Sequence, residues 1–167
     1  DLDALVYCLL QGQAGMRSLL DILEGKISPS GKLAETFIKK LEDSPTYETF
    51  NKNRRISKYL ESIYVGYRYY EKNDIEVKYP FGYGLSYSKF EYSSLQVNLN
   101  GVSLTLKNVG DYDAYETVEL FIGKKDSAFF RPIKELKGFK KVYLEEGQEK
   151  EVFIPFDEYS FRVFSKD

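Results

Sequence analysis

The sequence predicts an α/β fragment followed by an all-β, immunoglobulin-like (fibronectin type III-like) sandwich. Apolar residues recur at helical spacing early in the chain, whereas they alternate with polar residues in its second half. A stretch rich in tyrosine and glycine, residues 63–90, lies between the two patterns. We therefore expect three regions: the end of a larger α/β domain over 1–45, a structured connector over 46–90 and the β-sandwich over 91–167.

The first region contains one strand–turn–helix unit. Leu5–Leu10 is a short apolar run closed by a glycine-containing turn, which is typical of a parallel strand covered on both faces. Apolar residues then recur every three or four positions from Ala14 to Leu23, and Gly25 stands where a helix-ending glycine belongs. One strand and one helix cannot bury both of their faces, so we expect this unit to be the tail of a larger domain.

A tight turn follows the predicted helix. Ser28-Pro29-Ser30-Gly31 combines a proline, which fixes one backbone angle, with a flexible glycine. The chain is expected to run extended over 34–37 and to be polar and turn-rich over 38–49. In the connector, we expect Gly66, Gly82 and Gly84 to set the path of the backbone and the aromatic residues to seal an interface between the two flanking regions.

The second half has the two-residue period of strands. Leu95, Val97 and Leu99 alternate with polar residues, and Asn100-Gly101 predicts a hairpin turn into the next strand. Further strands are expected over 117–122, 139–144 and 149–156, with polar turns between them, as in a β-sandwich. Residues 159–164 are a candidate start for one more strand, and the sandwich is expected to lack its last strand.

The overall composition excludes several functional classes. With 24 basic and 26 acidic residues the formal charge is −2, which is not the positive footprint of a general nucleic-acid binder. Apolar runs fall short of the roughly 20 residues that a membrane helix needs. We expect neither nucleic acid nor a membrane as a partner. A signal peptide begins with positively charged residues, but this sequence begins with Asp1 and Asp3. We therefore expect the sequence to start inside a longer protein, so its first residues give no indication of the cellular compartment.

Residues suited to catalysis are scarce. The chain has no histidine, which removes serine–histidine and cysteine–histidine catalysis and histidine-ligated zinc. Its glycines lack the spacing of a phosphate-binding loop. Paired carboxylates are the groups a glycosidase uses, but Glu42-Asp43, Glu145-Glu146 and Asp157-Glu158 all lie in hydrophilic turns. We therefore expect no catalytic residue, metal or cofactor in this chain.

The 15 tyrosines and 12 phenylalanines permit two interpretations. Aromatic faces stack on sugar rings, so the sandwich is a candidate carbohydrate-binding or protein-interaction module. Tyrosine also joins apolar area to a polar tip, which suits a half-buried interface between domains. Because tryptophan is absent, we favour the interface.

Several motifs, in order along the whole chain, resemble one known family. They are LLQGQAG, DILEGKISPSGKLAETF, SPTYETF, VGYRYYEK, YPFGYGLSYSKFEYSSL, LKNVGDYDAYETVELFI and RPIKELKGFKKVYLEEGQEKEVFI. In this order they resemble the C-terminal half of family three glycoside hydrolases, and the resemblance looks closest to the β-glucosidase branch.

This resemblance implies a parent enzyme with a TIM-like barrel, an α/β sandwich domain and a fibronectin type III-like domain. The parent would hydrolyse β-glucosides or cello-oligosaccharides with retention, through a covalent glycosyl-enzyme. Its nucleophile and its acid/base would both lie upstream, in the missing N-terminal barrel and α/β domain. The chain is thus expected to be inactive alone and to support the parent structurally.

One loop is a candidate for contact with substrate. Gln11, Gly12 and Gln13 follow the predicted strand, and loops at the carboxyl ends of strands line ligand crevices in open α/β sheets. We therefore expect them at the pocket edge of the parent. The sequence departs from the family here, which often has proline in place of Gln11 and a glycine pair in place of Gly15-Met16.

Overall fold

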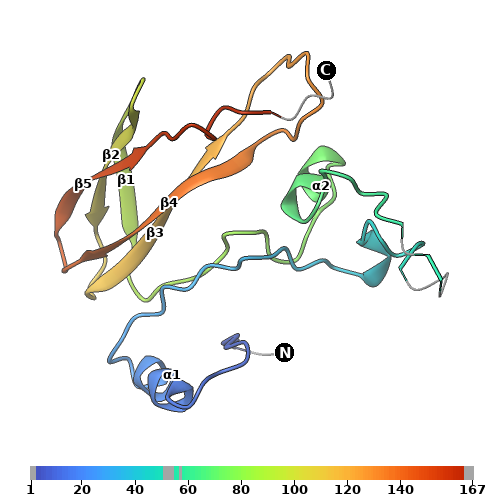
Figure 1. Cartoon of the computed structure of the whole chain (residues 1–167). Helices are drawn as coiled ribbons and strands as arrows, with labels where there is room; N and C mark the ends of the chain where they lie inside the picture. The colour runs from blue at the N-terminus through green and yellow to red at the C-terminus, as the bar shows by residue number, and fades with distance from the viewer. Residues whose placement is uncertain (1–2, 51–54, 57, 164–167) are drawn as a thin grey trace.

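The computed structural model describes residues 3–50, 55–56 and 58–163. Figure 1 shows a β-sandwich at one end of the molecule, helix α1 at the other and two extended segments running side by side between them. The predicted all-β sandwich is confirmed, because five antiparallel strands form two sheets.

The strand predicted at Leu5–Leu10 is wrong for this chain. These residues have no strand pairing, and Leu5 and Leu10 are 66% and 102% exposed. A buried parallel strand requires hydrogen-bonded neighbours on its edges and cover on its faces. The described part of residues 3–45 supplies only an isolated bridge, from Phe37 to Tyr79.

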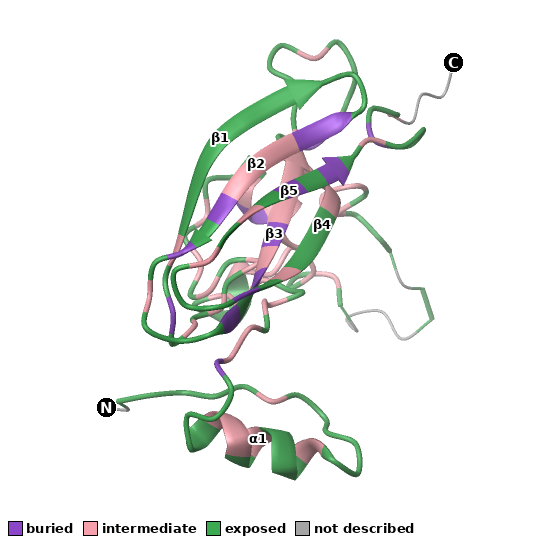
Figure 2. Ribbon diagram, turned by 90° about the vertical axis from the view of Figure 1, so that its left-hand side faces the viewer, coloured by how far each residue is buried: buried purple, intermediate pink, exposed green. Residues whose placement is uncertain are grey.

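The predicted helix is confirmed as α1, Gly15–Leu23. Its turn begins with the Gly15 amide donating to the Gly12 carbonyl at 3.1 Å. It ends at Leu23, and Gly25 follows the C-cap residue Glu24 with a φ of 74° in the left-handed region and an amide that donates to the Ile22 carbonyl at 3.0 Å. No residue of α1 is fully buried, and Figure 2 shows the helix standing apart from the sandwich.

The connector contains a helix that the sequence pattern does not predict. A short 3₁₀ turn, Leu41–Asp43, precedes it, and α2 spans Tyr67–Lys72 with Tyr70 buried. Gly66 enters α2 with a φ of 61°, a conformation open mainly to glycine, and Gly82 has a φ of 80°. The expectation that these two glycines set the path of the connector is confirmed.

The sandwich has a three-stranded sheet in the order β1-β2-β5 and a two-stranded sheet of β3 and β4. Its core is formed by inward-facing apolar side chains from both sheets, because alternate residues of a strand point to the same face. The strands are β1 Phe90–Asn98, β2 Gly101–Asn108, β3 Ala114–Ile122, β4 Glu135–Leu144 and β5 Glu149–Pro155, and the buried core comprises Leu106, Val118, Leu144, Val152 and Ile154.

The predicted hairpin between β1 and β2 is present, but its turn lies one residue earlier than expected. Asn98 pairs with Gly101, so Leu99 and Asn100 form the loop. The Asn98 Oδ1 accepts hydrogen bonds from the amides of Asn100 and Gly101, at 2.8 and 3.2 Å, and so fixes the turn from its first residue. Gly101 belongs to the strand, where a Cβ would collide with the carbonyl of Ile154.

Strand β1 is exposed along most of its length (Figure 2). The register shifts between Ser93 and Gln96, and Ser94 has a φ of 53°, so β1 contains a bulge. Leu95 and Val97 are 68% and 67% exposed, although their alternation suggested a buried face, and the residues between and after them are exposed as well.

The candidate strand over 159–164 is not formed in its described part, 159–163. A turn replaces it, because the Ser160 hydroxyl donates to Asp157 Oδ1 at 2.7 Å and the Ser160 amide donates to the Asp157 carbonyl at 3.2 Å. Phe161 packs edge-on against Phe156, with ring centroids 4.7 Å apart, which holds the turn against the sandwich. Residue 164 lies outside the described residues.

Candidate functional site

The three predicted pocket-edge residues lie on the surface. Gln11, Gly12 and Gln13 are exposed in the turn before α1, and they line neither of two cavities, of about 370 and 360 Å³, in the described part of the chain. Their proposed contact with substrate stays a prediction.

The most extensive side-chain site joins the N-terminal region to the sandwich through the connector. Residues 28–37 run beside residues 79–87 as a hydrogen-bonded ribbon (Figure 1). The Leu33 amide donates to the Tyr83 carbonyl, and the Gly82 amide donates to the Leu33 carbonyl, both at 2.8 Å. At Gly84 an added Cβ would lie 2.1 Å from the Gly31 carbonyl oxygen, so this residue is glycine because the two backbones approach so closely.

Hydroxyl groups tie the far end of this ribbon to α1. The Ser28 and Ser86 hydroxyls are 2.8 Å apart, and Ser28 Oγ also accepts the Tyr87 amide at 3.0 Å. The Tyr87 hydroxyl donates to the Ile22 carbonyl at 2.9 Å. The last turn of α1 is therefore positioned by the connector.

Lys32 and Glu116 form the polar centre of the interface. Lys32 Nζ lies 3.2 Å from Glu116 Oε1 and donates to the Gly84 carbonyl at 3.2 Å. Both side chains are mostly buried, at 19% and 10% exposure. The Tyr92 hydroxyl donates to the same Glu116 oxygen at 2.9 Å. The ribbon, β1 and β3 thus meet at one carboxylate, which the sequence analysis did not identify.

The ionisation of this cluster follows from its burial. Burial, and then the Glu116 carboxylate, raise the pKa of the Tyr92 phenol well above its ordinary value, so Tyr92 remains a hydrogen-bond donor. Burial also raises the pKa of Glu119, against the opposing effect of Lys32 and with a further contribution from Glu116. Glu116 and Glu119 face Lys32 of the ribbon and line neither cavity, so their role is structural. We call the group of Lys32, Glu116 and Glu119 the clamp.

Aromatic rings extend the interface on both sides of this clamp. Phe37 packs edge-on against Tyr7 and Tyr79, at centroid distances of 5.2 and 6.3 Å. Further along the connector, Phe81 and Tyr67 contact Phe121 of β3 in a three-ring cluster. The expectation that connector aromatics seal the interface is confirmed by these contacts.

A buried amide fixes the junction of connector and sandwich. Asn108 is completely buried, and its Nδ2 donates to the carbonyls of Tyr112 and Leu144 at 2.8 and 3.3 Å. Its Oδ1 accepts the Ser88 hydroxyl at 2.5 Å and the Gly110 amide at 3.1 Å. Because each polar atom of the amide is satisfied, this side chain fixes the path of three loops at once.

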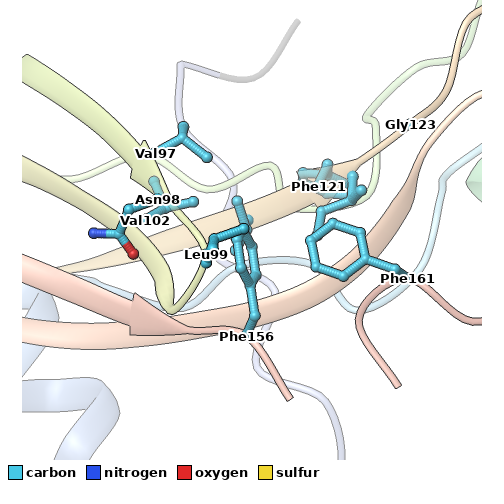
Figure 3. Close-up of a pocket in the computed structure, with 10 residues that line it drawn as sticks. Val97, Asn98, Leu99, Val102, Phe121, Gly123, Phe156 and Phe161 are labelled. Carbon is cyan, nitrogen blue, oxygen red and sulfur yellow. The ribbon is translucent and has the colours of Figure 1, made fainter. Parts of the chain in front are cut away.

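A cavity of about 370 Å³ lies between the β1–β2 hairpin, the end of β3 and the segment after β5, and Figure 3 shows the side chains that line it. Its walls are apolar and include Val97, Leu99, Phe121, Phe156 and Phe161. No Asp, Glu, Lys or Arg lines it, so it offers no acid, base or ion-pairing group for chemistry on a sugar.

The carboxylate pairs considered above lie at the surface. At least one member of each is exposed, and neither cavity includes any of Glu42, Asp43, Glu145, Glu146, Asp157 or Glu158. Within the described ranges no group of three or more His, Cys, Asp or Glu side chains is arranged to hold a metal ion. No helix in those ranges is long and apolar enough to cross a membrane.

Comparison with known proteins places both halves of the chain. Residues 1–87 match the sequence profile of the glycosyl hydrolase family 3 C-terminal domain, and residues 116–167 match that of a fibronectin type III-like domain. A thermostable β-glucosidase B of Acetivibrio thermocellus is 44% identical over 164 residues, covering 93% of this chain and 22% of the relative.

Two further proteins extend the comparison. An exo-α-(1→6)-L-arabinopyranosidase of Bifidobacterium breve is 42% identical over 164 residues, covering 94% of this chain and 21% of the relative. The crystal structure of a family 3 β-glucosidase from Bifidobacterium adolescentis superposes with a TM-score of 0.87 and 40% identity, over 93% of this chain and 24% of that one.

The chain thus spans about a fifth of the length of the curated relatives that it matches. The α/β fragment expected at the N-terminus is confirmed by the family match, although its strand is not formed here. The chain belongs to glycosyl hydrolase family 3, of which it carries the C-terminal domain region and a fibronectin type III-like domain.

Proposed function

We propose that this chain is a non-catalytic part of a retaining β-glucosidase, in which the sandwich and connector hold the α/β region in place. The observation that carries the proposal is the interface centred on Lys32 and Glu116, where the ribbon, β1 and β3 meet at one buried carboxylate. A catalytic carboxylate would be exposed to a cleft that can hold substrate, whereas the Glu116 carboxylate is enclosed by Lys32 and Tyr92.

Hydrolysis by the complete enzyme would require two positioned carboxyl groups, one as acid/base and one as nucleophile, about 5–5.5 Å apart across the scissile bond. The carboxylate pairs of this chain line neither cavity, so neither cavity brings two of these groups to a bound sugar. We expect the barrel and the remainder of the α/β domain to supply both groups, and β-glucosides or cello-oligosaccharides to be the substrates.

The purified chain should therefore release no nitrophenol from p-nitrophenyl β-glucoside, while the complete enzyme turns it over. In the complete enzyme, Lys32→Met should lower the melting temperature without changing the ratio of kcat/KM between two glycosides. Turnover by the chain alone would refute the non-catalytic role. A change in substrate preference without loss of stability would refute the supporting role.

Gln11, Gly12 and Gln13 retain a separate proposed role at the edge of the substrate pocket. Their exposure in the turn before α1 leaves these residues open to the rest of the enzyme. In the complete enzyme, Gln13→Ala should lower turnover of, or affinity for, a nitrophenyl glucoside, with Arg17→Ala on exposed α1 as a control. Wild-type kinetics for Gln13→Ala would refute this placement.

The carbohydrate-binding alternative has weaker support. The surface tyrosines Tyr115 and Tyr143 are tilted by 55° to one another and so present no continuous flat platform for a sugar. Tyr143 also donates its hydroxyl to Asp113 at 3.0 Å. Isothermal titration of the chain with cello-oligosaccharides should give no heat at millimolar concentration, and saturable binding would favour this alternative.

A further inference from the structure

A second cavity, about 360 Å³ in volume, lies where the connector meets the loop between β3 and β4. Figure 1 shows α2 beside this end of the sandwich, remote from α1. The cavity walls combine apolar groups with arginines, and the lining residues include Ile63, Arg68, Phe129, Phe130, Arg131 and Glu135.

Glu135 is surrounded by more positive charge than it can neutralise. Its carboxylate oxygens lie 3.4 Å from Arg68 Nη2 and 3.8 Å from Arg131 Nη2. Lys137 Nζ lies 3.6 Å from the same carboxylate, which is only 15% exposed. Three cations therefore face one anion in a partly desolvated site, where charge is screened less than in water.

Neighbouring ion pairs do not offset this excess. Lys134 is paired with Glu71 at 2.9 Å, and Arg162 is paired with Glu158 at 2.9 Å. Each of these pairs is neutral as a unit. This cluster contains three cations, Arg68, Arg131 and Lys137, and one anion, Glu135, so it retains two positive charges.

Arg131 also has hydrogen-bonding capacity that the chain does not use. Its side chain is 10% exposed, yet Nε and Nη2 make no hydrogen bond. These two nitrogens form one edge of the guanidinium, the fork that binds a carboxylate through two parallel hydrogen bonds. Leaving such donors buried without acceptors is unfavourable, so an incoming acceptor would be stabilised by them.

Contacts with the connector hold the loop that carries Arg131 both before and after that residue in the chain. The Tyr64 hydroxyl donates to the Arg131 carbonyl at 3.3 Å, and the Tyr64 ring packs edge-on against Phe130 at 5.2 Å. The Tyr67 hydroxyl accepts the Leu136 amide at 2.8 Å. The backbone that carries the guanidinium is therefore positioned by the connector before any ligand arrives, which reduces the entropy lost on binding.

We propose that this cavity binds a carboxylate carried on an apolar stem. The carboxylate pairs with the Arg131 fork and with Arg68, and the stem lies against Ile63, Phe129 and Phe130. Glu135 Oε2 stands beyond hydrogen-bond length from Arg131 Nη2, so it can turn toward Lys137 and admit the ligand. The planar fork and apolar walls favour a carboxylate over a free inorganic ion.

The acid can be a free small molecule or a glutamate side chain of a polypeptide, because both present the same group. Titration calorimetry of the full chain at low salt would use 3-phenylpropionate for the first source and N-acetyl-phenylalanyl-glutamate amide for the second. The neutral analogue 3-phenylpropanol is the matched control for the charge. Saturable binding of either acid, without binding of the alcohol, supports the site and identifies the better source.

Arg131→Gln should weaken this binding by about tenfold or more, the effect of losing one charge-assisted pair. Arg68→Gln provides a second variant at a more exposed position, with Arg17→Gln on α1 as the charge-matched control. Circular dichroism would verify that each variant is folded. The proposal is overturned if neither acid binds the wild-type chain at about 10 mM, a weak-affinity limit, or if folded Arg68→Gln and Arg17→Gln bind equally well.

Discussion

Lys32 Nζ lies 3.2 Å from Glu116 Oε1, across the boundary between the N-terminal ribbon and strand β3. The ammonium also donates to the Gly84 carbonyl, so one side chain connects the ribbon, the connector and the sandwich. With only 10% of the Glu116 side chain exposed, removal of the lysine would leave a carboxylate with little access to water.

Lys32→Met should destabilise the chain by about 2 kcal/mol, because Glu116 would lose its cation while it remains buried. The measurement is the midpoint of urea-induced unfolding at pH 7, monitored by circular dichroism. Lys124→Met, on the exposed β3–β4 connection, is the matched control and should have little effect. Equal midpoints for the two variants would contradict the clamp.

Glu119→Gln should stabilise the chain at pH 7 and have little effect near pH 4. The pKa of Glu119 is raised above its ordinary value of 4.5, chiefly by burial, so its ionised form is less favourable in the folded state than in the unfolded state. That penalty is complete above the folded pKa and disappears as pH falls below 4.5. Urea unfolding at both pH values tests this, and a larger effect at the acidic pH would contradict it.

Gly84→Ala should weaken the ribbon, with an expected loss of about 1–3 kcal/mol, because its Cβ would collide with the Gly31 carbonyl. Gly12→Ala is the control, since no atom lies within 4 Å of the corresponding Cβ and no positive φ is required there. Hydrogen exchange of the Leu33 and Gly82 amides should accelerate only in the Gly84 variant. Unchanged exchange rates of these two amides in Gly84→Ala would contradict the prediction and show that the ribbon tolerates the methyl group.

Asn108→Ala should destabilise the chain by about 3 kcal/mol, because the buried amide makes four hydrogen bonds, two of them buried, and their partners lose an acceptor or donor. Asn100→Ala, in the exposed β1–β2 loop, is the matched control and should change stability only slightly. Thermal unfolding of both variants provides the comparison. Similar melting temperatures would mean that Ser88 and the loops reorganise around the missing amide.

Local patterns were sufficient for the elements whose stability is local or periodic. Helix α1 ends at Leu23, just before the left-handed Gly25, as its spacing and glycine predicted, since capping depends on near neighbours in the chain. The alternation after residue 90 predicted strands, and five are present with boundaries differing by a few residues, whereas the candidate strand after residue 159 is not formed in its described part. The turn before β2 shifted by one residue because the Asn98 side chain caps it.

Other elements depended on partners that no local pattern reveals. Leu5–Leu10 has the composition of a buried strand, but a strand forms only where another supplies its hydrogen bonds. Helix α2 is short, and it is held by contacts with residues far along the chain, including the Tyr67–Leu136 hydrogen bond. The alternation in β1 predicted one buried face, but both faces of this strand are largely exposed, because the cover of a strand face comes from elsewhere in the fold.

The sequence by itself determined the two architectures, the family resemblance and the absence of histidine chemistry, because these depend on composition, period and motif order. Only the tertiary structure brought Lys32 to Glu116, 84 positions away, and set Arg131 beside Arg68 with its fork unpaired. From the sequence alone, a charged residue is expected to lie on the solvated surface. Burial changes its role, because desolvation leaves an ionised group dependent on the partners that the fold provides.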